Sequence, residues 1–95
     1  MRVTYGRRAT GQLANIFSHI AKDNPRAAAE VVARIEQAAS SLGEFPESGQ
    51  RSSRLPRLRW TAVPDYPYLI FYTILRNRTV RVVRILHGAR QRHRP

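Results

Sequence analysis

The chain has 95 residues, which suffices for one compact domain and excludes a second. Its composition, 42% hydrophobic and without cysteine, is typical of a folded protein and excludes disulfides and thiolate metal sites. Seventeen basic residues stand against six acidic ones, so the net charge of +11 favours a nucleic acid or an acidic protein as partner.

The positive charge is concentrated in the second half of the chain. Residues 1–50 carry six basic and five acidic side chains, whereas residues 51–95 carry eleven arginines and one acid, Asp65. Arginine suits bidentate pairing with phosphate or carboxylate. A GC-rich genome would explain the preference for Arg over Lys but not the net charge. We therefore expect the C-terminal half to meet an anionic partner.

The N-terminal segment predicts a short strand followed by a helix. Val3 and Tyr5 alternate before Gly6, as residues of a strand do. From Arg7 to Asp23, apolar residues recur on one face of a 3.6-residue period: Ala9, Leu13, Ile16, Phe17 and Ile20. No segment of the chain has the apolar run of a signal peptide or a membrane span, so we expect a cytoplasmic protein without membrane contact.

A second helix is predicted to begin at Pro25. Asp23 or Asn24 can cap its first N–H groups, and proline suits the first helical position. An apolar stripe continues to Gly43, which we expect to end the helix in the left-handed conformation. The short link makes the two helices an antiparallel hairpin with one apolar face.

Residues 44–56 contain two prolines, a glycine and three serines, and are predicted to form a loop. Three strands are then expected over 57–63, 68–75 and 79–86. The predicted class is α+β, in the order β-α-α-β-β-β, with an antiparallel sheet packed on one side by the helical hairpin.

The last two strands are expected to form a hairpin whose turn has Asn77 at positive φ and Leu75 opposite Val80. This register predicts two faces. One face would carry Ile70, Tyr72, Ile74, Arg81, Val83, Ile85 and His87. The other would carry Leu69, Phe71, Thr73, Leu75, Val80, Val82, Arg84 and Leu86.

The order of the sequence phrases resembles the ParE/RelE superfamily of toxins. The phrases are L-x-x-I-x-x-x-I from Leu13, DNPRAA, L-x-x-F-P-x-x-G from Leu42, LRW with YPYLIFYTI, and VVRILHGAR. The resemblance implies one toxin domain over residues 1–95 with a basic tail at 88–95, no cofactor, and a ParD-like antitoxin as hetero-oligomeric partner. It also implies one of two targets. RelE-like members cleave messenger RNA on the ribosome without a metal, and ParE-like members inhibit DNA gyrase.

Metal-free RNA cleavage needs proton-transfer groups and cations that stabilise the transition state. His87 is a candidate acid or base, and Tyr72 or Glu47 a candidate second group. Phosphate could be held by Arg59, Arg81, Arg84 and Arg90. However, Leu69 stands where such ribonucleases usually carry a basic residue, and the tail GARQRHRP lacks their tyrosine. These departures favour a gyrase inhibitor, with an mRNA endoribonuclease as the alternative.

The candidate binding residues follow from the same reasoning. We expect the target to contact Arg59, Arg81, Arg84, His87 and Arg90, and the antitoxin to contact Trp60, Tyr66, Phe71 and Arg84. Four of these residues have a structural alternative. The two aromatic residues Trp60 and Tyr66 could be core, His87 could bond a carbonyl at its strand end, and Arg84 could pair with Asp65 or Glu47. No metal site is expected.

Overall fold

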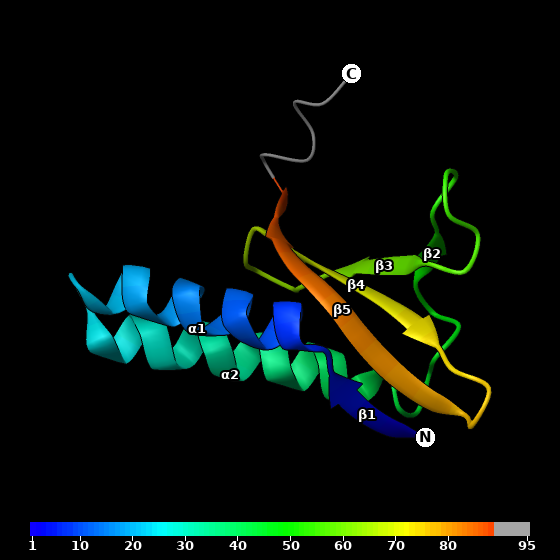
Figure 1. The fold of residues 1–95 in the computed structure, drawn as a ribbon. Coiled ribbons are helices and arrows are strands. Elements are labelled where there is room, and N and C mark those ends of the chain that lie inside the picture. The colour runs from blue at the N-terminus through cyan, green and yellow to red at the C-terminus, as the bar shows by residue number, and fades with distance from the viewer. Residues whose placement is uncertain (89–95) are drawn as a thin grey trace.

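Two helices and five strands make up the fold in the computed structural model, which describes residues 1–88 (Figure 1). In chain order they are β1 (Arg2–Tyr5), α1 (Arg7–Ala21), α2 (Pro25–Ser41), β2 (Gln50–Arg51), β3 (Arg59–Ala62), β4 (Tyr68–Ile74) and β5 (Thr79–His87). The predicted α+β class is confirmed. Residues 89–95, with Arg90 and nearly all of the expected basic tail, lie outside the described residues.

The helical hairpin forms as its caps and spacing predict. The Asn24 side-chain oxygen accepts a hydrogen bond from the Ala27 N–H at 3.0 Å, and Pro25 takes the first turn of α2. The two helices lie side by side and antiparallel (Figure 1). The short link is therefore sufficient to bring both apolar stripes onto one face.

Gly43 does not adopt the left-handed conformation predicted for it, since no glycine of the described residues has positive φ. A glycine is needed at this position for a different reason, which is the close approach of the N-terminus. A Cβ added there would lie 2.5 Å from the Met1 carbonyl oxygen, and the Met1 amino group donates to the Gly43 carbonyl at 2.6 Å. Gly43 thus admits the N-terminus against the end of α2.

The sheet is mixed, with strand order β1-β5-β4-β3-β2. The strands from β5 to β2 pair antiparallel as predicted, but β1 pairs parallel to β5. A parallel pair requires a long crossover, which the helical hairpin and the three intervening strands provide. The expectation of a wholly antiparallel sheet is therefore wrong at the β1 edge. The expected loop 44–56 also contains the two-residue strand β2.

The turn between β4 and β5 contains one residue more than predicted. Ile74, and not Leu75, lies opposite Val80, and the Leu75 N–H donates to the Thr79 carbonyl at 2.8 Å. The residue with positive φ in this turn is Arg78, at 62°, rather than Asn77. The shift exchanges the faces of the first residues of β5, because side chains alternate along a strand.

The predicted faces of Val80, Arg81 and Val82 are consequently wrong. Val80 and Val82 are fully buried beneath the helices, whereas Arg81 is exposed on the other face. A register shift opposite Phe71 and Tyr72 leaves Val83 as an extra residue on β5. Beyond this bulge the predicted faces hold again: Ile85 lies opposite Ile70, and Arg84 opposite Phe71.

The core lies between the helical hairpin and one face of the sheet. It consists of Ala9, Val31, Ile35, Ala39, Leu42, Val63, Ile70, Tyr72, Val80, Val82 and Ile85. The hairpin extends past the strands at its turn end (Figure 1). Neither helix of residues 1–88 is long and apolar enough to cross a membrane. We call the sheet face away from the helices the outer face; no helix of the described residues packs on it.

Candidate functional site

A row of three side chains crosses the outer face from strand to strand. Trp60 lies opposite Phe71, and Phe71 lies opposite Arg84, so all three point the same way. Each is half-buried. We call these residues the outer-face row. It places two large aromatic rings beside one guanidinium, a combination common at protein interfaces.

Arg81 lies on the same face, opposite Thr73, and is exposed. Neither Arg81 nor Arg84 forms an ion pair within residues 1–88, where the one ion pair is Arg34–Asp65 at 3.1 Å. The suggested pairing of Arg84 with Asp65 is therefore wrong, because that carboxylate is held by α2. The two outer-face guanidiniums remain available to an anionic partner.

Tyr72 lies on the helix side of the sheet and has no exposed surface. Its hydroxyl donates to the Pro46 carbonyl at 2.8 Å and accepts from the Gly49 N–H at 2.9 Å. Both bonds hold the segment after α2 against the sheet. A hydroxyl so buried and so engaged serves packing rather than proton transfer to a substrate.

Arg59 lies opposite Tyr72 and so is not on the outer face. Its Nη1 donates to the carbonyl oxygens of Glu47 at 3.3 Å and Gly49 at 3.1 Å. These bonds tie the start of β3 to the same segment that Tyr72 holds. The structure therefore does not bring Arg59 together with Arg84.

His87 ends β5 on the helix-facing side, opposite Tyr68, with the two rings edge to face at 5.5 Å between centroids. Tyr68 and Tyr72 are four residues apart on β4, which corresponds to about 13 Å along the strand. His87 is thus far from Arg59 and on the other side of the sheet from Arg84. The candidate catalytic residues do not form one constellation.

Tyr66, the fourth residue expected to contact an antitoxin, is half-buried and packs against the core. It belongs with the turn between β3 and β4 and not with the outer-face row. This position agrees with the structural alternative given for Tyr66.

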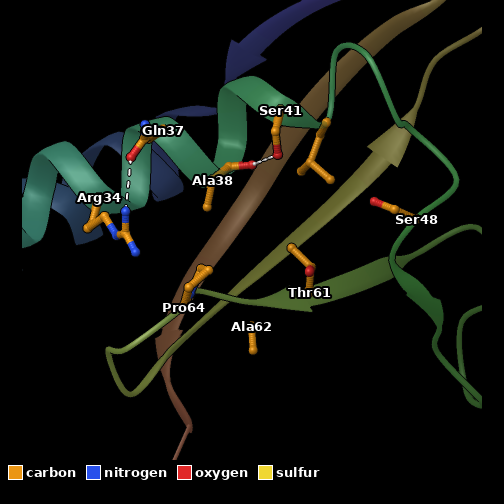
Figure 2. A pocket seen from close by; sticks show the side chains of 9 residues that line it. Arg34, Gln37, Ala38, Ser41, Ser48, Thr61, Ala62 and Pro64 are labelled. Atoms are coloured by element: carbon orange, nitrogen blue, oxygen red, sulfur yellow. Dashed lines mark hydrogen bonds between the residues drawn. The ribbon is translucent and has the colours of Figure 1, made fainter.

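A trough of about 270 Å³ separates the C-terminal half of α2 from β3 (Figure 2). Most residues around the trough are small. Figure 2 labels Arg34, Gln37, Ala38, Ser41, Ser48, Thr61, Ala62 and Pro64. The Arg34–Asp65 ion pair joins α2 to the β3–β4 turn near this trough. Since both partners are substantially exposed, this pair contributes about 0–1 kcal/mol to stability.

A larger cavity of about 610 Å³ lies where β3 begins and β4 ends. We call it the basic cavity because four arginines line it: Arg51, Arg57, Arg59 and Arg76. Glu47 is also part of its wall. Of these arginines, only Arg59 was singled out from the sequence. The spacing of arginines from residue 51 to residue 59 was the available signal, but it cannot show that Arg76 joins them.

Among residues 1–88, no three His, Asp or Glu side chains gather as metal ligands would. Burial, and secondarily the negative charge of Glu36, raises the pKa of Tyr5 above its usual value. Tyr5 lies on β1 and packs against the core, so burial of its neutral phenol is part of the packing of the fold.

The sequence matches one protein family over residues 3–92, described as the ParE toxin of the type II toxin-antitoxin system parDE. A candidate toxin of Sinorhizobium fredii, Y4kP, is 40% identical over 90 residues, covering 95% of this chain and 91% of that protein. Toxin RelE2 of Caulobacter vibrioides is 36% identical over 89 residues, covering 94% and 97%.

The fold is similar to that of a solved chain from the chromosomal ParDE TA system of P. aeruginosa. The TM-score is 0.78, with 92% of this chain and 95% of the other covered. At 20% identity this likeness concerns the fold alone.

Proposed function

The chain belongs to the ParE toxin family of type II toxin–antitoxin systems, and from this membership we propose that, when free, it inhibits DNA gyrase. A ParD-like antitoxin silences it in a hetero-oligomeric complex. Both interactions take place in the cytoplasm, where gyrase acts on DNA.

The observation that carries this proposal is the outer face. It presents the outer-face row and Arg81 from adjacent strands, with no carboxylate of residues 1–88 paired to either arginine. Aromatic rings supply buried area at an interface, and arginine supplies charge complementarity. Such a face suits docking onto a large anionic assembly such as gyrase with its DNA.

The antitoxin shares this face in our proposal. Trp60 and Phe71 are half-buried in the free chain and would lose their remaining exposure under a partner. Arg84 lies at the end of the same row, where an acidic antitoxin residue would reach it. Occlusion of Arg84 would then prevent the toxin from docking on its target.

The placement of the proton-transfer candidates also favours a binding toxin. Tyr72 is buried with both hydrogen-bonding roles used, and His87 lies far from Arg59 and on the other side of the sheet from Arg84. General acid–base catalysis requires these groups within hydrogen-bonding reach of one substrate.

Ribosome-dependent cleavage of messenger RNA is the second candidate, because one observation favours it. Glu47, a possible proton acceptor, shares the basic cavity with Arg59. A carboxylate can accept the proton of an attacking hydroxyl while neighbouring guanidiniums stabilise the charge that develops on a phosphodiester.

Two parallel assays separate the candidates. Purified toxin is added to a plasmid supercoiling reaction with gyrase, and to ribosomes programmed with a defined messenger RNA. We expect supercoiling to stop and linear plasmid to accumulate, while the messenger RNA stays intact. Cut messenger RNA with undisturbed gyrase would replace our proposal with the second candidate. Addition of the antitoxin encoded beside the toxin gene must abolish either effect.

A further inference from the structure

The basic cavity is a site that gyrase inhibition does not account for. Its volume of about 610 Å³ falls within the range of roughly 300–1,000 Å³ that ligand sites occupy. The four arginines come from separate segments: Arg51 from β2, Arg57 and Arg59 from the chain entering β3, and Arg76 from the turn after β4. They therefore surround a hollow instead of following one strand.

The charge in this hollow is unbalanced. Four guanidiniums share it with a single carboxylate, that of Glu47, and none of the four forms an ion pair within residues 1–88. Like charges brought together around one concavity repel, and the walls focus their positive potential. An anion in the hollow would relieve this repulsion.

Part of the site is held in place before any ligand arrives. Arg59 is fixed by hydrogen bonds from its Nη1 to the Glu47 and Gly49 carbonyls. The remaining N–H groups of the guanidinium are available to bind a ligand. The hydroxyl of Thr73 donates to the Arg57 carbonyl at 3.0 Å and anchors the segment that carries this arginine. A preorganised site loses less conformational entropy on binding.

The wall of the cavity also has an apolar part, formed by Pro56, Ile74 and Leu75. A nucleic-acid strand offers phosphates for the guanidiniums and flat base or sugar surfaces for the apolar part. An acidic peptide would offer carboxylates in place of the phosphates, and competition by polyglutamate in the test below separates the two. We propose that the basic cavity binds the phosphodiester backbone of a single nucleic-acid strand.

This inference goes beyond gyrase inhibition and does not require it. If the toxin does act on gyrase, the strand is part of the gyrase-bound DNA. If the toxin acts on the ribosome, the strand is messenger RNA. The same cavity serves both cases because both strands present the same phosphodiester groups.

The test is fluorescence anisotropy of the purified full chain with a labelled 12-nucleotide DNA strand, measured over a series of salt concentrations. The variant Arg57→Gln/Arg76→Gln removes two cavity charges. Its matched control, Arg8→Gln/Arg26→Gln, removes two exposed charges from the starts of the helices. Thermal unfolding of both variants establishes that they are folded.

On a single strand, each phosphate contact contributes about 0.7 to the slope of log affinity against log salt. We therefore expect the cavity variant to lower that slope by about 1.4 and the affinity at 0.15 M salt by about tenfold. The control should change affinity by less than about threefold, since its charges lie outside the cavity.

Matched RNA and duplex probes identify which strand the cavity prefers, and preference for either single strand supports the proposal. Equal losses in the two variants, or no binding by the unmodified chain, would overturn it, because binding would then not depend on the cavity. Displacement of the probe by polyglutamate at equal charge, sensitive to Arg57 and Arg76, would overturn it as well. The cavity would in that case be a carboxylate site. No gyrase is present, so failure here leaves the supercoiling test intact.

Discussion

The buried hydroxyl of Tyr72 offers a sharp test of whether this residue is structural or catalytic. Tyr72→Phe removes the bonds to the Pro46 carbonyl and the Gly49 N–H, and leaves both groups without this partner. An unsatisfied buried polar group costs about 1–3 kcal/mol, so we expect a loss of about 2–3 kcal/mol in the free energy of unfolding. For a domain of this size, that loss lowers Tm by roughly 10–20 °C.

The measurement is thermal unfolding followed by circular dichroism, with Tyr66→Phe as the control. The Tyr66 hydroxyl has no hydrogen bond within residues 1–88, so its removal should shift Tm by no more than about 2 °C. Gyrase inhibition by Tyr72→Phe is then assayed at a temperature where the variant is folded, and should equal that of the unmodified toxin. An unchanged Tm together with lost activity would refute the structural role and restore Tyr72 as a catalytic candidate.

Three further predictions follow from the same structure. Arg84→Ala should weaken gyrase inhibition about tenfold or more, whereas His87→Ala should leave it within about twofold; the readout is the toxin concentration that halves supercoiling. Asn24→Ala removes the cap of α2 and should cost about 1 kcal/mol, seen as a lower urea midpoint with an unchanged slope. Gly43→Ala should lower Tm because the added Cβ would meet the N-terminal backbone. Gly11→Ala, which has open space around it, should raise the free energy of unfolding by about 0.5–1 kcal/mol. Equal responses of the two variants would contradict the packing described here.

Much of the fold can be predicted from local patterns. The two helices follow from the 3.6-residue apolar period and from Asn24-Pro25, and β3, β4 and β5 from alternation and strand propensity. These signals depend on neighbouring residues alone. The class and the helical hairpin follow from them.

The pairing of distant segments could not be predicted in the same way. The parallel pairing of β1 with β5 brings together residues more than seventy positions apart. The register of β4 and β5 depends on a single extra turn residue and on the bulge at Val83, and neither has a distinctive local signal. An error of one residue exchanges the two faces of a strand, which is why Arg81 and Val82 were placed on the wrong sides.

The candidate site, like the fold, could be predicted from the sequence only in part. The outer-face row depends on register beyond the bulge, where the predicted faces of Phe71 and Arg84 are correct. By contrast, the position of Arg59 among the carbonyls of the segment after α2 depends on tertiary contacts. The basic cavity likewise requires the end of β4 to meet the start of β3.

Photocrosslinking tests the central claim most directly, namely that one sheet face meets both antitoxin and target. Benzoylphenylalanine is introduced in place of Phe71 on the outer face or, as the control, in place of Phe17, which is 39% exposed on α1. Our account predicts that the probe at position 71 crosslinks to the antitoxin in the complex and to gyrase when the antitoxin is absent. Crosslinks to both partners from position 17 alone, with none from position 71, would contradict it.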